Sequence, residues 1–219
     1  MIAIDGPAAS GKGTLARALA EQLNYAYLDT GALYRATALE ALEAGGNPED
    51  ETTAVQGAAT LSEKIAQAGP VAVLGNPALR TDDVGQAASK VASIQAVRDA
   101  LTDFQRNFAT NPGESYKGAI LDGRDIGTVI CPGAAVKLFV TASDTVRAER
   151  RFLELTKAGH DTTYEQVLAD VRARDARDTD RDAAPMRAAS DAVVLDTSEM
   201  TIDQAVARAV KEVSAKFSA

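Results

Sequence analysis

The stretch that organises this chain is IAIDGPAASGKGT, residues 2–14. It begins with a short apolar run typical of a buried strand, and from Lys12 to Leu23 leucines recur every four residues, as on one face of a helix. Between strand and helix lies a glycine-rich turn, Gly6 to Lys12, of the form G-x-x-x-x-G-K. Its glycines let the backbone curl so that successive N–H groups point at phosphate oxygens, and the helix N-terminus adds the positive end of its dipole. The stretch therefore predicts a phosphate-binding loop.

We expect ATP on this loop, with Lys12 reaching the β- and γ-phosphates as a catalytic residue. Because Gly13 follows Lys12, the hydroxyl that usually comes next is displaced by one position to Thr14, and direct contact of Thr14 with Mg²⁺ is left open. An ordinary glycine turn is the alternative interpretation. The predicted ATP-binding residues of the loop are Gly6, Pro7, Ala8, Ala9, Ser10, Gly11, Lys12, Gly13 and Thr14.

Four further apolar runs predict strands, at residues 25–28, 118–122, 136–140 and 192–195. The later runs are almost continuously apolar, as expected for parallel strands that are covered on both faces. Helical stretches lie between them, and capping signals mark their starts: Ser143, Thr163 with Gln166, and Thr201 with Gln204. We therefore predict an α/β fold with a doubly wound five-stranded parallel sheet of the P-loop kinase type.

Residues 47–114 break this alternation with repeated glycine and proline punctuation. Between these breaks we expect helix, as in Val84 to Phe108, and one short β-like run, Val71 to Leu74. We interpret the segment as an inserted lobe. The predicted parts are a core sheet domain of residues 1–46, 115–155 and 183–219, an inserted lobe of residues 47–114, and an arginine-rich segment of residues 156–182.

The composition excludes several classes of protein. The formal net charge of -8 and a sequence pI of about 4.8 argue against binding to nucleic acid or to an anionic membrane. A single cysteine, Cys131, and a single histidine, His160, rule out an internal disulfide and a zinc cluster. Met1 leads directly into the first apolar run without a signal-like leader, so we expect a cytoplasmic protein. We expect a monomer, because no long apolar seam is evident.

A second ligand is predicted beside the loop. Residues 29–35 directly follow the second strand, where strands of such a sheet end and ligands bind. Arg35 offers a planar fork for a phosphate, and Tyr34 an amphipathic wall. The alternative is that Arg35 pairs with Glu40 or Asp29 on a solvated face.

The residues after the third strand also predict a site. Asp122 lies where the acidic residue near Mg²⁺ is found in this kind of sheet. Arg124 and Asp125 are adjacent opposite charges flanked by glycines, which is typical of a ligand-facing loop. A plain surface ion pair is the alternative for these two residues.

Eight of the fifteen arginines fall between Arg147 and Arg187. Arg174, Arg177 and Arg181 follow helical spacing, and we expect them to form a clamp on transferring phosphates, for which planar forks are suited. The alternative is a solvated helix crossed by ion pairs. For Arg150, which we count among the ATP-binding residues, the two interpretations are evenly balanced.

Taken together, these motifs resemble the cytidylate kinase family, the bacterial CMP/dCMP kinases. The resemblance rests on residues 4–14, 28–35 and 122–129, on shorter matches at 80–81, 88–92 and 97–98, and on residues 174–181, in the family's order. It implies that the inserted lobe binds a monophosphate and that the arginine-rich segment is a short lid. It also implies transfer of the γ-phosphate of ATP to CMP or dCMP with Mg²⁺, with lobe and lid closing over the nucleotides. Thr30 stands where many family members have serine, which keeps the hydroxyl.

The resemblance also implies roles for individual residues. Arg35, Arg80 and Arg124 would hold the acceptor phosphate, Arg174 and Asp178 would lie near the sugar, and Arg177 and Arg181 near the transferring group. Ser89, Arg98 and Asp125 would recognise cytosine. The substrate-binding residues expected in total are Thr30, Tyr34, Arg35, Arg80, Ser89, Arg98, Asp122, Arg124, Asp125, Arg174 and Asp178.

Elementary hydrogen-bond chemistry agrees with this assignment. Asp125 would accept from the cytosine amine while Arg98 and Ser89 donate to its acceptors, whereas uracil would leave Asp125 facing a carbonyl oxygen. Two rival functions are a kinase of another small acceptor, such as AMP or shikimate, and a nucleotide-sensing module without turnover. The residues 122–125 and 89–98 speak against the first, and the lid arginines against the second.

Overall fold

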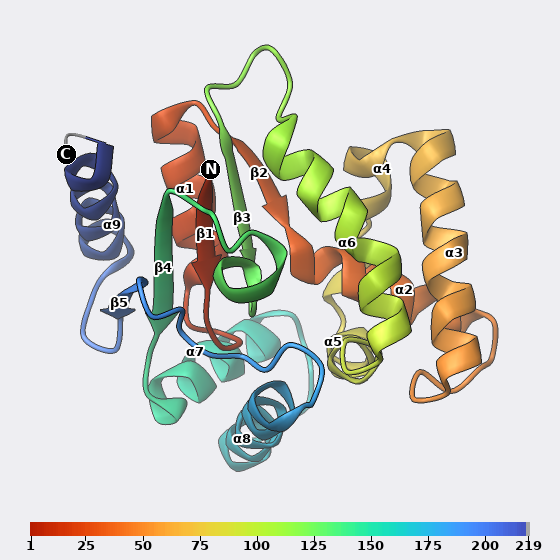
Figure 1. The fold of residues 1–219 in the computed structure, drawn as a ribbon. Coiled ribbons are helices and arrows are strands. Elements are labelled where there is room, and N and C mark those ends of the chain that lie inside the picture. The colour runs from red at the N-terminus through yellow and green to blue at the C-terminus, as the bar shows by residue number, and fades with distance from the viewer. Residues whose placement is uncertain (218–219) are drawn as a thin grey trace. The chain divides into compact units, whose positions relative to one another are not determined.

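The structure, a computed structural model, describes residues 1–217 and contains a five-stranded sheet (Figure 1). The strands are β1 (Ile2–Asp5), β2 (Ala26–Asp29), β3 (Ala119–Gly123), β4 (Val136–Thr141) and β5 (Val193–Asp196). Their order is β2-β3-β1-β4-β5, and Ile2 of β1 lies opposite Ile120 of β3 and Val136 of β4, both in parallel register. The predicted doubly wound, five-stranded parallel sheet is confirmed.

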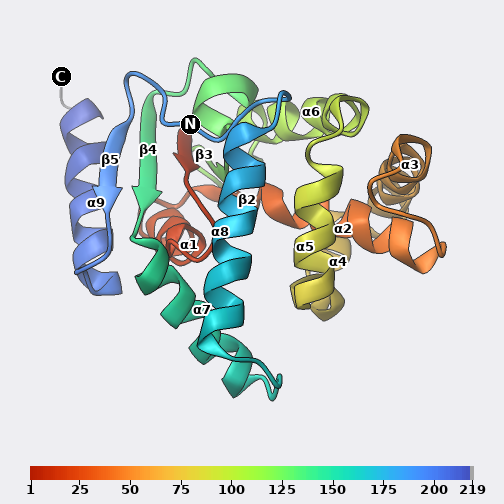
Figure 2. The same ribbon diagram turned by 90° about the horizontal axis from the view of Figure 1, so that it is seen from below.

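The main core surrounds β1, the central strand. Ile2 and Ile4 of β1 are fully buried between β3 and β4. Helices α1 (Lys12–Leu23) and α9 (Ile202–Phe217) pack against each other and line this core with Leu15, Leu19 and Val213. Figure 2 shows both helices beside the strands. Helix α1 occupies the residues predicted from its leucine spacing, so the turn of residues 6–11 is held between two buried elements.

Helices α7 (Asp144–Lys157) and α8 (Tyr164–Asp180) pack on each other through a smaller apolar cluster of Ala148, Leu155, Val167 and Val171. Both predicted helix starts are confirmed: the Ser143 side chain accepts from the backbone of α7, and Thr163 and Gln166 exchange a reciprocal pair of bonds. The same exchange joins Thr201 and Gln204 before α9. Local capping chemistry therefore decides where these helices begin.

The chain divides into two compact units. The first comprises Met1–Leu28, Phe108–Asp180 and Ala184–Ala219, and the second comprises Asp29–Asn107 with Arg181–Ala183. The helices of the second unit are α2 (Thr30–Glu43), α3 (Glu51–Ala68), α4 (Pro70–Leu74), α5 (Asp82–Val91) and most of α6 (Gln95–Thr110). The inserted lobe was predicted to start at residue 47, but this compact unit begins earlier, at Asp29. The reason is that α2 packs against α3 and α5.

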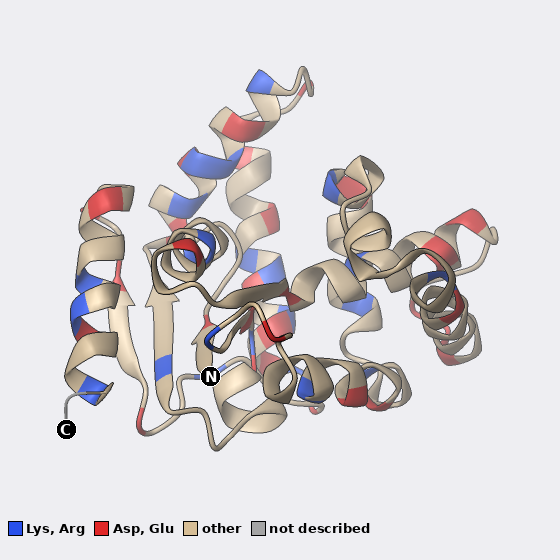
Figure 3. Ribbon diagram, turned by 90° about the horizontal axis from the view of Figure 1, so that it is seen from above, with Lys and Arg blue, Asp and Glu red and all other residues tan. Residues whose placement is uncertain are grey.

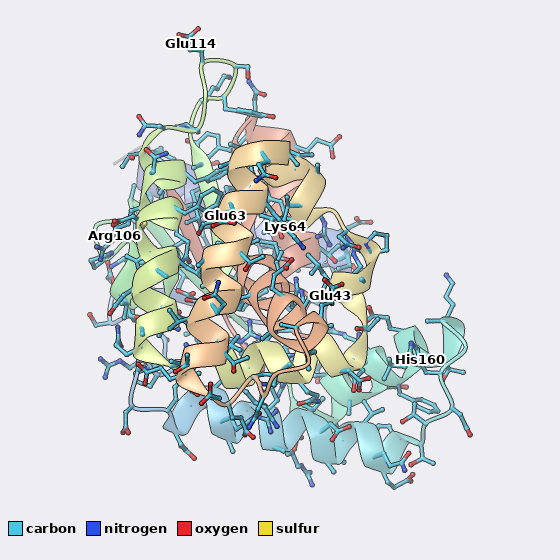
Figure 4. The ribbon with its side chains drawn as sticks, turned by 90° about the vertical axis from the view of Figure 1, so that its right-hand side faces the viewer. Glu43, Glu63, Lys64, Arg106, Glu114 and His160 are labelled. Atoms are coloured by element: carbon cyan, nitrogen blue, oxygen red, sulfur yellow. The ribbon has the colours of Figure 1, made fainter. Side chains whose placement is uncertain are left out.

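Ion pairs help to join α2 and α3 in the second unit. The Lys64 ammonium of α3 lies 2.6 Å from the Glu40 carboxylate of α2. Figure 4 labels Lys64 on α3 and Glu43 on α2. The hydrogen bond to Glu40 raises the pKa of Lys64, and the negative charge of Glu43 adds to this shift. The predicted boundaries of the monophosphate-binding lobe and of the lid as functional parts stay predictions.

Two local predictions are wrong. Val71 to Leu74, predicted as a β-like run, forms the short helix α4 because Pro70, whose φ suits a first helical turn, opens it. The helix expected from Val84 to Phe108 is interrupted after Val91, so α5 and α6 are separate elements. Among residues 1–217, no helix is long and apolar enough to cross a membrane.

Candidate functional site

Side chains hold the loop between β1 and α1 by donating hydrogen bonds to its backbone carbonyl groups. Lys12 Nζ lies 3.4 Å from the carbonyl oxygen of Pro7, and Arg147 Nη1 donates to that of Ala8 at 3.2 Å. The Thr197 hydroxyl donates to the carbonyl oxygen of Ser10 at 3.0 Å. Three carbonyls of the loop are thus bonded to side chains of the first unit.

This carbonyl bonding determines where the loop's N–H groups point. In a planar trans peptide the C=O and the following N–H point in opposite directions. The N–H groups of Ala8, Ala9 and Gly11 therefore face away from Lys12, Arg147 and Thr197, respectively. Successive N–H groups turned to one side at a helix N-terminus are the arrangement that binds a phosphate.

The backbone of the loop adopts conformations that few residues tolerate. Gly6 has a φ of 147°, and a Cβ built on it would stand 2.0 Å from the carbonyl oxygen of Val140 in β4. Ala9 has a φ of 58°, which is uncommon for a residue with a side chain. The loop therefore lies against β4 at a distance that only glycine permits at position 6.

Asp122, at the end of β3, reaches the start of α1. A Cβ at Gly13 would stand 3.2 Å from Asp122 Oδ2, and the Asp122 side chain is buried. Asp122 therefore lies beside Gly13, whereas Thr14, the next residue, is exposed. Carboxylate oxygens are ligands that Mg²⁺ prefers, and Asp122 brings one to the start of α1. In residues 1–217 no cluster of three or more acidic, cysteine or histidine side chains forms a metal site.

A buried acid that the sequence analysis left without a role holds the residues after β3. Asp5, the last residue of β1, accepts hydrogen bonds from the backbone N–H groups of Ile126 and Gly127, each 2.8 Å long. Burial raises the pKa of Asp5 to about 6, although these two bonds oppose the shift. Asp125 directly precedes the π-helical turn Ile126–Ile130 and is itself buried. Asp5 thus anchors the loop that carries Arg124 and Asp125; the signal in the sequence was an acid at the end of a buried strand.

Three predicted substrate-binding residues meet in the first unit. Arg124 Nε donates to Asp178 Oδ2 at 2.9 Å, and Arg174 Nε lies 4.0 Å from the same oxygen. The Asp178 side chain is only 5% exposed, so this carboxylate is satisfied by arginines rather than by water. The alternative of a plain surface pair between Arg124 and Asp125 is not what the structure shows, because Arg124 bonds Asp178 and Asp125 is buried.

Arg150 lies beside the phosphate loop. Its Nη2 donates to the carbonyl oxygen of Thr197 at 2.7 Å and its Nη1 to the Thr197 hydroxyl at 3.2 Å. A Cβ at Gly11 would stand 3.9 Å from Arg150 Nη1. Arg150 therefore reaches the loop directly and also supports the threonine that holds the Ser10 carbonyl.

In the second unit, Arg35 is paired with Asp29 through a 2.5 Å contact. This is one of the two pairings named as the alternative for Arg35. Asp29 also accepts from the N–H of Ala32 and so caps α2, whose first residue, Thr30, is buried. The turn that carries these residues is thus stabilised by its own carboxylate.

A second cluster in this unit surrounds the end of α5. Arg98 and Arg181 both direct Nη1 toward the carbonyl oxygen of Ala92, at 3.2 and 3.4 Å. The Arg98 guanidinium also lies over the Tyr34 ring, 5.6 Å from its centroid. Ser89 on α5 is buried, like Arg98, whereas Arg80 is exposed at the end of the 3₁₀ turn Pro77–Arg80.

The three arginines of the predicted clamp, Arg174, Arg177 and Arg181, do not all lie on one helix. Arg174 and Arg177 lie on α8, but this helix ends at Asp180, and Arg181 belongs to the second unit. Helical spacing alone therefore misplaced Arg181. Figure 3 shows basic and acidic residues interspersed along the helices. His160 lies exposed in the turn after α7, as Figure 4 shows, in line with the absence of a predicted role.

Comparison with known proteins places the whole chain in one family. The family model for cytidylate kinase matches residues 2–215. Cytidylate kinase from Rhodospirillum rubrum is 56% identical over 210 residues, which cover 96% of this chain and 95% of that protein. Cytidylate kinase from Paramagnetospirillum magneticum is 54% identical over 216 residues, which cover 99% and 98%.

Among solved structures, an uncharacterised protein from Eubacterium ventriosum has a TM-score of 0.52 at 14% identity and covers 98% of this chain and 97% of that one. At this identity the likeness shows a shared fold alone. The match of the family model and the identity to two full-length relatives agree with the motifs and with the loop geometry: this chain belongs to the cytidylate kinase family of phosphotransferases.

Proposed function

We propose that this chain transfers the γ-phosphate of ATP to CMP or dCMP, producing ADP and CDP or dCDP. The observation that carries the proposal is the phosphate loop, whose carbonyls are bonded to Lys12, Arg147 and Thr197, so that the N–H groups that follow them face away from these side chains and are available to an anion. Membership of the cytidylate kinase family supports the choice of acceptor.

On the donor side, residues 6–14 bind the phosphates of ATP, and Arg150 contributes from beside Gly11. Thr14 and Asp122 are the residues that would hold Mg²⁺ with the nucleotide. Bound there, the ion neutralises charge on the phosphate oxygens. Lys12 moves from the Pro7 carbonyl to the transferring phosphate, which offers a stronger partner for an ammonium group.

On the acceptor side, Arg35, Arg80 and Arg124 bind the phosphate of CMP, with Thr30 and Tyr34 near it. Arg35 and Arg124 each already contact one carboxylate. A guanidinium has five N–H donors, so each can bind a phosphate oxygen without losing its acid. We also propose that residues 47–114 form the monophosphate-binding lobe and residues 156–182 the lid.

Base selection falls to Asp125, Arg98 and Ser89, each of which is at most 5% exposed. Asp125 accepts from the cytosine amine, and Arg98 and Ser89 donate to its N3 and O2 acceptors. Buried polar groups penalise a wrong partner, because an unpaired group loses its hydration without compensation. UMP should therefore be a poor acceptor.

The chemical step needs no general base. The acceptor phosphate is close to doubly charged at neutral pH, so its oxygen attacks the γ-phosphorus directly while the bond to the ADP oxygen breaks. Arg177 and Arg181, with Lys12, neutralise charge on the transferring group, and Arg174 and Asp178 bind the sugar. Catalysis is then alignment and charge neutralisation, which suits a chain with one exposed histidine.

We further propose a monomeric cytoplasmic enzyme that does not bind nucleic acid or membranes. The formal net charge of -8 opposes attraction to either of these anionic partners.

The experiment that tests the function is an assay of ADP release with MgATP and CMP, dCMP, UMP, AMP, GMP or shikimate. Strong release with CMP and dCMP and weak release with UMP is the expected result. Equal rates with CMP and UMP would keep the kinase but discard base selection by Asp125. ATP binding without ADP release for all six acceptors would instead favour a nucleotide-sensing module.

A further inference from the structure

A buried arginine connects the phosphate loop to the arginine-bearing helix. Arg147 on α7 is 4% exposed, and its Nε donates to the carbonyl oxygen of Ala142 at 2.9 Å. Its Nη1 donates to the carbonyl oxygen of Ala8 at 3.2 Å and to Asp175 Oδ1 at 3.0 Å. Its Nη2 donates to the other oxygen of Asp175. One guanidinium thus joins the end of β4, the phosphate loop and α8.

The bond to Ala8 acts on the most constrained peptide of the loop. It fixes the carbonyl of the peptide between Ala8 and Ala9, and Ala9 has a φ of 58°. Because the peptide is planar, this bond also orients the Ala9 N–H away from Arg147. Loss of the bond would let this peptide rotate toward an ordinary conformation.

The bond to Asp175 acts on α8. Asp175 lies between Arg174 and Arg177 in the sequence of this helix, and its side chain is 24% exposed. A bidentate pair restrains direction as well as distance, so it sets the rotation of α8 relative to α7. Both ends of the pair therefore lie next to groups that we propose to contact the phosphates of ATP.

A second arginine–aspartate pair joins the same two helices and provides a matched comparison. Arg172 Nε on α8 donates to Asp144 Oδ2 on α7 at 2.7 Å, three residues before each member of the buried pair. The side chains of this outer pair are 60% and 36% exposed. Exposed pairs of this kind contribute little to stability.

We propose that Arg147 and Asp175 are positioning residues, which hold the phosphate loop and Arg177 of α8 in the arrangement that binds the phosphates of the donor nucleotide. The inference rests on the proposed function for its kinetic consequences. Its binding consequences concern the nucleotide alone and hold for a kinase or a sensor.

The test compares identical substitutions in the two pairs: Asp175→Asn and Arg147→Lys against Asp144→Asn and Arg172→Lys. Asparagine keeps the shape but weakens the bidentate bond, and lysine keeps the charge but cannot hold Ala8, Ala142 and Asp175 at once. Calorimetry of ADP binding and steady-state kinetics with CMP are run on each folded variant, with thermal unfolding as the check on folding.

For the inner pair we expect ADP affinity and kcat/KM for ATP to fall about 10- to 100-fold, the size of effect that misplaced groups produce. The KM for CMP should rise less than the KM for ATP, because Arg174, which we propose to bind the CMP sugar, adjoins Asp175 on α8 but lies outside the phosphate loop. The double variant Arg147→Lys with Asp175→Asn should lose no more than the worse single variant, because the pair acts as one unit. The outer-pair variants should match the wild-type protein.

A lower melting temperature with unchanged ADP affinity and unchanged KM for ATP would overturn the proposal, because the pair would then be only structural. Equal losses from the inner and outer pairs would also overturn it. If the wild-type protein bound ADP but phosphorylated no acceptor, the proposed function would fail, and ADP affinity in the four variants would still decide the role of the pair.

Discussion

The phosphate loop of the first unit and Arg35 of the second unit are held in different ways. Two carbonyls of the loop accept hydrogen bonds from Arg147 on α7 and from Thr197 after β5, both distant in sequence. Arg35 instead pairs with Asp29, six residues earlier in the chain. The loop thus presents backbone N–H groups that are already oriented. The Arg35 guanidinium, by contrast, already pairs with Asp29, so a ligand phosphate would have to share it with this carboxylate. The proposed donor side is organised by the fold, and the proposed acceptor side by side-chain pairing.

This difference predicts how each side responds to substitution. A backbone site fails when its path or the groups that hold its carbonyls are altered, while a side-chain site can be tuned by its neighbours. Four substitutions test the comparison, beginning with the largest expected effect.

Removal of the one loop side chain with a chemical role should have the largest effect. Lys12→Ala should lower kcat about 10²- to 10³-fold, the usual loss when one charge-stabilising donor is removed. Lys12 is only partly buried and its bond to the Pro7 carbonyl is 3.4 Å long, so the fold should be retained. ADP release with CMP measures kcat, and circular dichroism controls for folding. A rate near that of the wild-type protein would exclude Lys12 from the transfer step.

An altered loop path should act on stability instead. Gly6→Ala places a Cβ 2.0 Å from the Val140 carbonyl oxygen, so we expect loss of at least about 3 kcal/mol of unfolding free energy. Gly133→Ala is the control, because a Cβ there meets nothing within 4 Å. Urea unfolding of both variants measures the difference. Similar stabilities would show that the loop can move away from β4.

The donor side could be predicted from sequence because its signals are local. The glycine spacing, the leucine stripe of α1 and the capping boxes at Thr163 and Thr201 each involve residues close in the chain, and the structure confirms these elements. Val71 to Leu74 was misassigned, since a short apolar run does not distinguish strand from helix without its Pro70 start.

The supporting residues could not be predicted because their partners are distant in sequence. Arg147 lies 139 residues from Ala8, and Asp5 lies 121 residues from Ile126. Arg147 was one member of an arginine-rich stretch, and nothing in its spacing separated a buried guanidinium from exposed ones. Arg181 was misplaced for the opposite reason, because regular spacing continued past the end of α8.

The buried acid on the donor side should make stability depend on pH. The pKa of Asp5 is raised to about 6 from 3.8, so the folded state binds a proton that the unfolded state releases between these values. Its favourable contribution is therefore present at low pH and is lost as pH rises through about 6.

We compare unfolding free energies of the wild-type protein and Asp5→Asn at about pH 7.5 and about pH 4.5. The difference, wild type minus variant, should shift in favour of the wild type by about 2 kcal/mol at the lower pH. Asp191→Asn, which removes an exposed acid paired with Lys137, is the control. A difference that does not change with pH would mean that Asp5 is ionised in the folded state throughout this range.

The smallest effect is expected on the acceptor side, where Asp29 competes with a ligand phosphate for Arg35. Asp29→Asn keeps the acceptor that caps α2 through Ala32 but removes the charge that holds Arg35. Arg35 should then bind the CMP phosphate more readily, and we expect the KM for CMP to fall about two- to fivefold with the KM for ATP unchanged, the size expected for a half-exposed pair. Arg35→Lys, which keeps the charge without the fork, should raise the KM for CMP instead. A rise in the KM for CMP in Asp29→Asn would show that Asp29 orients Arg35 toward the phosphate rather than competing with it, and the acceptor side would then be as preorganised as the loop.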